Sequence, residues 1–388
     1  MYLSRKVLHL ALALTLATTL TAGATPDDKG RCQESVPFKS GVGGYASYRI
    51  PAVVQAKNTL LAFAEGRRGG SSDTGDIDIV LRHSTDGGCT WGPQQVVTDQ
   101  STSTIGNPAP VVDPKTGDVV LFSVRNGPVS EAQILRGEAS PEDTRRVFLQ
   151  RSTDNGRTFT PPTEITATTK QANWRWYATT PGHAIALRSG RLLVPANHSI
   201  APPAGSPDTG AEAKYYGGHS LYSDDGGRTW QIGYVDDNPD GYVNVNESTA
   251  AQLPDGRVYF NTREHNGTAP GTRADAYSSD GGKTLDKPFR PQATLIGPVV
   301  QASVLAVGNT LLYSGPADPA SRAALTIRVS KDQGVTWQPA LAISGLPAAY
   351  SDLVAIDRGA VGLLYETGDF SANETITFRR LSLKDLDR

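Results

Sequence analysis

Short apolar runs, separated by polar turns rich in Gly and Asp, recur along the whole chain. In the first clear unit the runs 47–56, 59–65 and 77–83 are rich in β-forming residues, and 94–97 can serve as a fourth strand. Runs of this length, bounded by Gly, Asp and Ser, are typical of antiparallel strands joined by tight turns. Four such runs in series predict one up-and-down sheet.

Five further sets of runs follow the first unit. The last set ends with the chain and lacks a fourth strand, and the run 34–39 near the N-terminus is free to supply one. We expect this N-terminal segment to close the last sheet, because pairing removes an exposed edge. The five sets are 107–112, 118–125 and 146–151; 183–187, 191–196 and 215–222; 248–253, 257–262 and 274–277; 299–307, 310–314 and 324–329; and 350–356, 360–365 and 375–383.

A turn motif, Ser-x-Asp-x-Gly-x-Thr-aromatic, follows the third strand in five of the six sets. Copies spaced by about 50 to 70 residues indicate a repeat architecture, and this period fits propeller blades. The Asp side chain can accept backbone N–H groups within the turn, and the Gly supplies unusual backbone angles. We therefore interpret these Asp boxes as turn structures rather than as catalytic or calcium-binding sites. The copies are 84–91, 152–159, 223–230, 278–285, where Leu285 replaces the aromatic residue, and 330–337.

The pattern as a whole predicts an all-β fold, a six-bladed β-propeller with four-stranded antiparallel blades. Two long polar loops, 126–145 and 201–214, interrupt it and are expected to overhang one rim, either as functional lids or as disordered segments. No Pro- or Ser-rich linker divides the chain of 388 residues. We therefore expect residues 25–388 to form a single β-propeller domain.

Residues 1–24 have the organisation of a secretory signal peptide. Arg5 and Lys6 precede an apolar run, 7–20, and Ala22-Gly23-Ala24 fits a small-residue cleavage site. The alternative, an N-terminal membrane anchor, is disfavoured because the run is short for a span. Removal of the two cations would change the net charge from −2 to −4, which gives no reason to expect nucleic acid or an anionic membrane as partner. We expect a secreted protein without membrane insertion.

The cysteine and histidine content argues against a metal site. Two cysteines, Cys32 and Cys89, cannot form a disulfide scaffold or a zinc site, and the histidines lack ligand spacing such as HExxH. Export permits a disulfide between the two cysteines, but two free thiols are an equal alternative. No metal or organic cofactor is expected.

Topology predicts that unusual charged residues gather on one face. In an up-and-down blade the start of strand one, the end of strand two and the loop that follows share one face, opposite the Asp boxes. Random placement would scatter the charges over both faces. Eight residues instead fall on the face opposite the boxes: Arg49, Arg68, Asp73, Glu247, Arg263, Arg322, Tyr350 and Glu366.

This ordered set resembles the secreted bacterial sialidases (exo-α-neuraminidases), a family with a six-bladed propeller. The resemblance covers essentially the whole chain after residue 24. It rests on Tyr48-Arg49-Ile50-Pro51 followed by Arg68 and Asp73, on Asn246-Glu247 followed by Arg263, and on Arg322, Tyr350 and Glu366. The Asp boxes alone are weak evidence of activity, because non-enzymatic propellers also carry them.

The resemblance implies an arginine triad, Arg49, Arg263 and Arg322, that clamps the carboxylate of sialic acid. Arginine suits this role because its planar fork forms bidentate bonds and keeps its charge. Arg328 is a nearby competitor for Arg322, although it lies inside a strand. Glu366 resembles the acid that orients Arg49.

The resemblance further implies Tyr350 as nucleophile, Glu247 as the base that activates it, and Asp73 as general acid and base. A neutral phenol avoids the repulsion that a carboxylate nucleophile would meet from the carboxylate of the substrate, and sialidases are a known exception to the two-carboxylate scheme. Asp76 and Asp78 are competitors for Asp73. Arg68 is expected to border the same pocket. Trp174, Trp176 and Tyr177 are expected either to line the sugar site or to pack between blades.

The resemblance implies an enzyme that hydrolyses terminal α-linked sialic acid with retention of configuration at the anomeric carbon. Its substrates would be glycans, glycoproteins or glycolipids, and it is expected to act as a monomer. The arginines would bind only the carboxylate of the substrate. They therefore do not distinguish sialic acid from deaminated sialic acid, nor hydrolysis from transfer of the sugar to another acceptor. A non-catalytic carbohydrate-binding propeller is the alternative from another class. Such a binding protein would be expected to have another residue in place of Tyr350, Glu247 or Asp73. All three residues are present in this sequence.

Overall fold

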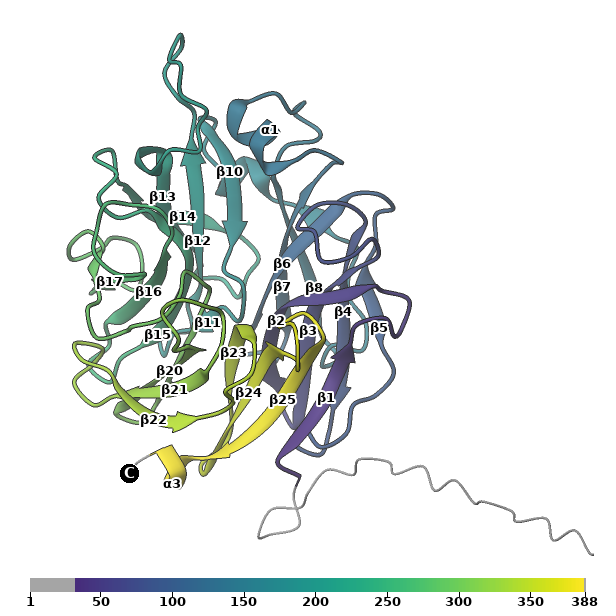
Figure 1. The fold of residues 1–388 in the computed structure, drawn as a ribbon. Coiled ribbons are helices and arrows are strands. Elements are labelled where there is room, and N and C mark those ends of the chain that lie inside the picture. The colour runs from purple at the N-terminus through teal and green to yellow at the C-terminus, as the bar shows by residue number, and fades with distance from the viewer. Residues whose placement is uncertain (1–31, 387–388) are drawn as a thin grey trace, which may run out of the picture.

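The computed structural model describes residues 32–386, which form an all-β fold (Figure 1). The predicted signal peptide lies outside the described residues. Within residues 32–386, no helix has the length and apolar character needed to cross a membrane. The helical elements described are short: α1 (Glu131–Arg136), α2 (Thr166–Thr169), α3 (Leu383–Leu386) and a 3₁₀ turn at Ala213–Tyr215.

Four of the sheets correspond to one predicted blade each; three of them have four strands, and the other has a fifth because β11 also pairs with β12. Their hydrogen-bonded order follows the chain except in the last sheet, where the N-terminal strand is added at the edge. In order these sheets are β10 (Trp174–Thr179), β12 (Leu192–Ile200), β13 (Tyr216–Ser223) and β14 (Gln231–Asp237), with β11 (Ile185–Ala186) beside β12; β15 (Val245–Gln252), β16 (Val258–Glu264), β17 (Arg273–Ser278) and β18 (Arg290–Pro291); β19 (Ser303–Val307), β20 (Thr310–Pro316), β21 (Leu325–Ser330) and β22 (Gln338–Ala342); and β23 (Ala348–Asp357), β24 (Ala360–Thr367), β25 (Thr375–Ser382) and β1 (Glu34–Lys39).

The prediction of six separate sheets is wrong, because the remaining eight strands form one sheet. Ile77 and Thr104 form a single parallel pair that joins two runs of four antiparallel strands. Hydrogen bonding between neighbouring runs is not visible in the sequence, which reports only the period of each strand. The strands are β2 (Ser47–Ala56), β3 (Thr59–Arg67), β4 (Ile77–Ser84), β5 (Gln95–Thr98), β6 (Thr104–Val112), β7 (Val119–Asn126), β8 (Arg146–Ser152) and β9 (Thr163–Glu164).

The inner strands contact one another in a closed circuit, which defines a β-propeller. Strand β2 contacts β6 and β23, β6 contacts β10 and β11, β12 contacts β15, and β19 contacts both β15 and β23. The predicted closure by the N-terminal segment is confirmed: β1 pairs with β25, from Glu34 opposite Arg379 to Lys39 opposite Thr375. This pairing covers the outer edge of the last sheet, as Figure 1 shows beside the C-terminal strand.

Two strand assignments from the sequence are wrong in position. The sheet containing β12 begins at β10, not at 183–187, where only β11 pairs. The long first strand expected at 299–307 begins at Ser303. Aromatic residues at 174–177 are also typical of a strand, and the flanking Gly182 and Pro181 limit pairing at 183–187.

The turn interpretation of the Asp boxes is confirmed. In the first box Asp86 Oδ1 accepts the backbone N–H groups of Cys89 and Thr90, each at 3.0 Å. Equivalent side-chain-to-backbone bonds recur at Asp154, Asp225, Asp280 and Asp332. The aspartates are therefore occupied by their own turns.

In the four boxes that end in an aromatic residue, that residue packs against the preceding unit of the ring. Phe159 meets Phe63 with ring centroids 6.2 Å apart, and Trp230 meets Phe122 at 4.5 Å. Trp91 of the first unit lies 5.4 Å from Phe378 of the last. Edge contacts between aromatic rings stabilise by about 0.5–1.5 kcal/mol beyond burial. The motif thus supplies both a turn and the contact between neighbouring units.

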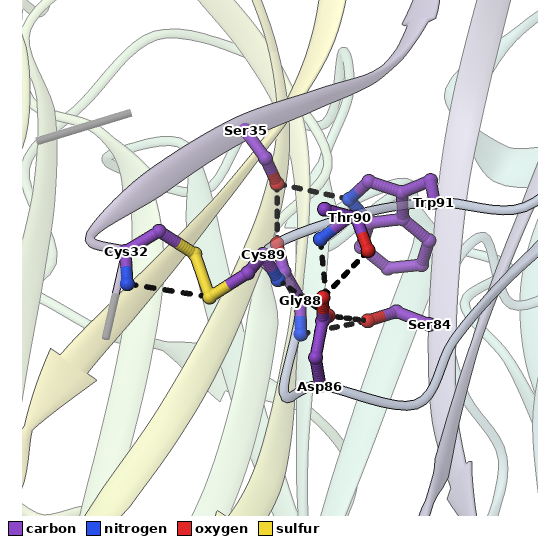
Figure 2. Close-up of a disulfide and its surroundings, with 8 residues drawn as sticks. All are labelled: Cys32, Ser35, Ser84, Asp86, Gly88, Cys89, Thr90 and Trp91. Carbon is purple, nitrogen blue, oxygen red and sulfur yellow. Dashed lines mark hydrogen bonds between the residues drawn. A yellow bond between two sulfur atoms is a disulfide. The ribbon is translucent and has the colours of Figure 1, made fainter. Parts of the chain in front are cut away.

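Cys32 and Cys89 form a disulfide, which decides the alternative that the sequence left open. The bond ties the segment before β1 to the first Asp box (Figure 2). Ser35 of β1 donates to the carbonyl of Gly88 and accepts from Trp91 Nε1 at 2.9 Å. The disulfide and these hydrogen bonds fix the closing strand on the first unit as well as on the last.

We expect removal of this disulfide to destabilise the fold. Replacing both Cys32 and Cys89 with Ser should lower the free energy of unfolding by about 2–4 kcal/mol, because the bond closes a loop of 57 residues. Urea unfolding of the variant and of the oxidised protein measures the difference. An unchanged unfolding midpoint would show that β1–β25 pairing and the Ser35 hydrogen bonds hold the closing strand without the disulfide.

A buried histidine pair lies within the sheet of β12, β13 and β14. His198 Nδ1 is 3.1 Å from His219 Nδ1, and His198 Nε2 is 2.7 Å from Asp237 Oδ1. The ring of Trp174 stacks on His198 with centroids 3.9 Å apart. His219 Nε2 has no hydrogen-bond partner among the described residues. Burial lowers the pKa of both histidines, and for His219 the shift is large.

This pair predicts acid-sensitive stability. Both folded pKa values lie below the unfolded value of about 6.5, so the unfolded chain binds protons first as the pH falls below that value. Below that pH, each of the two histidines lowers the free energy of unfolding by up to about 1.4 kcal/mol per pH unit. We expect urea unfolding at pH 7 and pH 5 to show a smaller acid loss for His219→Gln than for the unmodified protein.

His183→Gln is the matched control. Burial lowers the pKa of His183, but Asp352, 2.7 Å away, outweighs burial and raises it. A folded pKa above the unfolded pKa stabilises the fold at pH values below the unfolded pKa and adds no stability well above the folded pKa. His183→Gln removes only this stabilisation, so the variant should still lose stability between pH 7 and pH 5. Equal losses in His219→Gln and the unmodified protein would contradict the assignment.

Candidate active site

The five sheets converge on a cavity of about 240 Å³. Of the eight residues that topology assigned to one face, six line this cavity, Glu366 lies beneath it, and Arg68 lies elsewhere. The lining residues are Arg49, Ile50, Glu65, Arg67, Asp73, Thr104, Gly106, Asn107, Glu131, Arg145, Trp176, Ala178, Asn197, Tyr216, Asn246, Glu247, Arg263, His265, Arg322 and Tyr350.

Tyr350 on β23 and Glu247 on β15 meet in the cavity. The Tyr350 hydroxyl donates to Glu247 Oε1, and Arg263 Nη1 lies 2.9 Å from Glu247 Oε2 and 3.4 Å from the Tyr350 oxygen. Burial first, and then the charge of Glu247, raise the pKa of Tyr350, so the phenol is protonated near neutral pH. Glu247 is placed to accept this proton if the phenol oxygen attacks an electrophile.

Glu366 on β24 holds Arg49 and the Tyr350 backbone together. Its carboxylate accepts from Arg49 Nε at 2.9 Å and from Arg49 Nη2 at 3.2 Å. It also accepts the backbone N–H of Ile50 at 2.8 Å and of Tyr350 at 3.1 Å. Ile50 has φ 58°, a strained angle for a β-branched residue. Glu366, which is fully buried, maintains this conformation through the Ile50 N–H.

The three predicted arginines surround Tyr350. The guanidinium carbon of Arg49 lies 4.9 Å from the centroid of the tyrosine ring, and that of Arg322 lies 5.8 Å away. Arg322 Nη2 donates to the carbonyl of Val299 at 3.1 Å. Its competitor Arg328 donates instead to the carbonyl of Ile296 and does not line the cavity. The structure therefore brings Arg49, Arg263 and Arg322 together.

Asp73 lies over the cavity on the loop after β3. Its Oδ1 is 2.7 Å from Arg67 Nη1 and 3.8 Å from Arg49 Nη1, and its side chain is 79% exposed. Partial loss of water acts to raise the pKa of Asp73, but Arg67 and Arg49 outweigh it and hold the pKa below its usual value. The competitors Asp76 and Asp78 pair with Arg68, away from the cavity.

The expectation that Arg68 borders the pocket is wrong; Arg67 occupies that place. Side chains alternate along a strand, so Arg67 shares a face with Glu65, which pairs across the sheet with Arg49. Arg68 points to the other side, where it lies 2.8 Å from Asp78 and stacks on Tyr45. Strand alternation could have identified Arg67 from the sequence.

The three aromatic residues before the β12 strand divide between the two roles considered. Trp176 lines the cavity, and the guanidinium carbon of Arg145 lies 3.9 Å from its ring centroid. Trp174 and Tyr177 are buried in an apolar cluster between sheets and do not line the cavity. For these two the alternative of packing between blades holds, because the β-bulge between Trp174 and Tyr177 breaks the regular alternation and turns both side chains into the cluster.

Arg67, which was not predicted from the sequence, is a second arginine held in place by a buried glutamate. Glu65 Oε2 lies 2.6 Å from Arg67 Nη2, and Glu65 Oε1 accepts the backbone N–H of Asn107 at 2.8 Å. Asn107 has φ 53°. Glu65 thus repeats, one unit further on, the bond from Glu366 to the backbone N–H of a residue with positive φ, but its arginine comes from its own strand and not from the next unit. The repeat was a signal that could have identified Glu65.

The loop 126–145 contributes to the cavity, while 201–214 supplies no lining residue. Ser130 and Gln133 form a capping box at the start of α1, and Gly137 ends the helix with φ 73°. This ordered turn brings Glu131 to the cavity, and Arg145 follows at its end. In residues 32–386, no group of three or more His, Cys, Asp or Glu side chains could hold a metal ion.

These observations define a β-propeller with Asp-box turns whose central cavity holds a tyrosine–glutamate pair among arginines. Residues 58–363 match a family model described as a BNR repeat-like domain. The chain is 33% identical to the sialidase of Micromonospora viridifaciens over 94% of this chain. It is also 31% identical to sialidase-2 of Mus musculus, over 91% of this chain and 96% of that protein. The chain therefore belongs to the sialidase family.

A solved structure supports the same relationship. The Hadza microbial sialidase Hz136 superimposes with a TM-score of 0.79 at 28% identity, over 92% of this chain and 70% of that one. The chain spans 58% of the length of the Micromonospora viridifaciens relative.

Proposed function

We propose that this protein is a retaining exo-α-sialidase that releases terminal α-linked sialic acid from glycans, glycoproteins or glycolipids. The observation that carries the proposal is the hydrogen bond from Tyr350 to Glu247, made within reach of Arg263 and Arg49. Arg49, Arg263 and Arg322 would bind the substrate carboxylate, which is attached to the carbon that reacts.

In the first step, Tyr350 oxygen forms a bond to the anomeric carbon while Glu247 takes the phenolic proton. The bond from that carbon to the leaving oxygen breaks, and protonated Asp73 supplies the proton for the leaving alcohol. In the second step, Asp73 takes a proton from water as the water oxygen attacks. The bond to Tyr350 breaks, and Glu247 returns the proton to the phenol. Two displacements at one carbon retain its configuration.

We also propose that the eight-stranded sheet acts as two blades, so that the propeller has six. A single residue pair joins its two halves, and each half contains four antiparallel strands. We further propose that the protein is secreted after removal of residues 1–24 and acts as a monomer without a metal or organic cofactor. The disulfide between Cys32 and Cys89 supports an oxidising compartment.

An assay with two fluorogenic aryl α-glycosides tests the activity. One carries N-acetylneuraminic acid and the other carries its deaminated analogue. We expect release of the fluorophore from at least one of them, and release of the α-anomer of the sugar first, as judged by NMR. Binding of sialosides without release from either would support the carbohydrate-binding alternative. In the presence of lactose, a sialylated lactose product would indicate transfer.

A further inference from the structure

His265 lines the cavity beside Arg263, directly after the end of β16. Residues two apart on a strand share a face, so the direction of β16 that points Arg263 into the cavity also brings His265 there, while Glu264 between them does not line it. Among the histidines that the structure describes, His265 is the one that lines the cavity. It is exposed to solvent. A ligand in the cavity can therefore reach its ring.

The hydrogen bond between His265 and Arg263 fixes the protonation of the ring. Arg263 Nη2 lies 2.8 Å from His265 Nδ1. A guanidinium group can only donate, so Nδ1 must accept and carries no proton. The proton of the neutral ring is then on Nε2. His265 is thus a neutral acceptor that engages one N–H group of an arginine expected to bind the substrate.

The charged groups around His265 agree with a neutral ring. Partial burial first, and then the charge of Arg263, lower the pKa of His265. Arg322 acts in the same direction, and Glu247 acts in the opposite direction. The neighbouring carboxylate of Glu264 is occupied by two backbone N–H groups. Because the pKa of His265 lies below the usual value of about 6.5, the ring is uncharged near neutral pH.

A carboxylate in the cavity would reverse this balance, an argument that depends on the proposed function. Arg263 and Arg322 would bind the carboxylate of sialic acid, and its charge would offset the two cations that disfavour protonation of His265. A carboxylate oxygen can accept from two donors, so Arg263 and a protonated Nδ1 can both donate to it in place of their direct bond. Because His265 is exposed, its ring keeps part of its water when the ligand binds. The added negative charge therefore outweighs the added burial.

We propose that His265 takes up a proton when the cavity binds the carboxylate of sialic acid, and that the imidazolium then binds the same carboxylate as Arg263. Proton binding and ligand binding must strengthen each other by the same factor. The affinity for sialic acid therefore rises as the pH falls through the range in which His265 titrates. The three arginines cannot supply this dependence themselves, because arginine stays charged throughout that range.

Calorimetric titration of the full chain with free sialic acid tests the proposal. Titrations in two buffers with different enthalpies of ionisation give the number of protons taken up on binding. We expect uptake of a fraction of one proton at about pH 6 and none at about pH 8, because the ring titrates near the lower value. The dissociation constant should be about fivefold lower at the lower pH. Where the heat of binding is too small, the inhibition constant of sialic acid against an aryl sialoside gives the same ratio.

His265→Asn is the matched variant, because an amide oxygen can replace Nδ1 as the acceptor for Arg263 but does not titrate. It should take up no proton, and its dissociation constants at the two pH values should be equal. Glu131→Gln is the control, since Glu131 also lines the cavity and burial raises its pKa, which makes it the other candidate for the proton. This variant should keep the proton uptake.

Proton uptake that persists in His265→Asn and disappears in Glu131→Gln would overturn the inference and assign the proton to Glu131. Cleavage of an aryl sialoside by a protein whose affinity for sialic acid does not change between the two pH values overturns this inference, while the sialidase proposal stands. Absence of both cleavage and binding overturns both.

Discussion

Replacing Tyr350 with Phe is expected to lower kcat for every sialoside by about 10³-fold or more, because loss of a nucleophile removes the covalent pathway. The substitution deletes one oxygen and leaves the ring that Arg49 and Arg322 face. Binding of free sialic acid should therefore persist. Steady-state kinetics with an aryl sialoside and calorimetric titration of the product measure the two quantities separately.

Tyr313→Phe provides the control, since Tyr313 is a buried tyrosine on β20 that does not line the cavity. It should keep nearly full turnover. Full activity in Tyr350→Phe would disprove the assignment of this residue as nucleophile. Loss of both turnover and binding would instead indicate that the hydroxyl chiefly holds Glu247 and Arg263 in place.

Replacing Asp73 with Ala is expected to separate substrates by leaving group. A sugar alcohol needs a proton as it departs, so kcat/KM for a sialyl-oligosaccharide should fall by about 10²–10⁴-fold. An aryl leaving group departs without that help, and its first step should be much less affected. Parallel assays of sialyllactose and an aryl sialoside give the comparison. Asp76→Ala, whose carboxylate pairs with Arg68 outside the cavity, is the control.

The same residue predicts a pH dependence. Asp73 acts as an acid only when protonated, and Arg67 and Arg49 hold its pKa low despite partial loss of water. Cleavage of sialyllactose should therefore decline as the pH rises from the acid range toward neutrality, and more steeply than cleavage of the aryl sialoside. Equal losses in Asp73→Ala on both substrates would count against its role as the acid.

The repeat in the sequence was sufficient to predict most of the fold. Turn chemistry in the Asp boxes is local, because Asp86 bonds to N–H groups three and four residues away. The closing strand β1 followed from counting strands, since the last unit was one short. The joining of two units through Ile77 and Thr104 could not be predicted, because it depends on how two neighbouring sheets approach in space.

Prediction of the site succeeded where topology alone decides position. Strand direction correctly gathered Arg49, Glu247, Arg263, Arg322 and Tyr350 around the cavity. It failed for Arg68 and left Trp174 and Tyr177 open, where the outcome depends on which face of a strand each side chain occupies.

By itself the sequence determined the all-β repeat, the turns and the face on which the charged residues lie, because these follow from local backbone chemistry and chain direction. Only the tertiary structure decided that the loop after β3 brings Asp73 to Arg67 and Arg49, that Cys32 bonds to Cys89, and that Arg145 covers Trp176. These pairings join residues on different strands and loops. They depend on distances and side-chain directions that are set only when the sheets pack around their common centre.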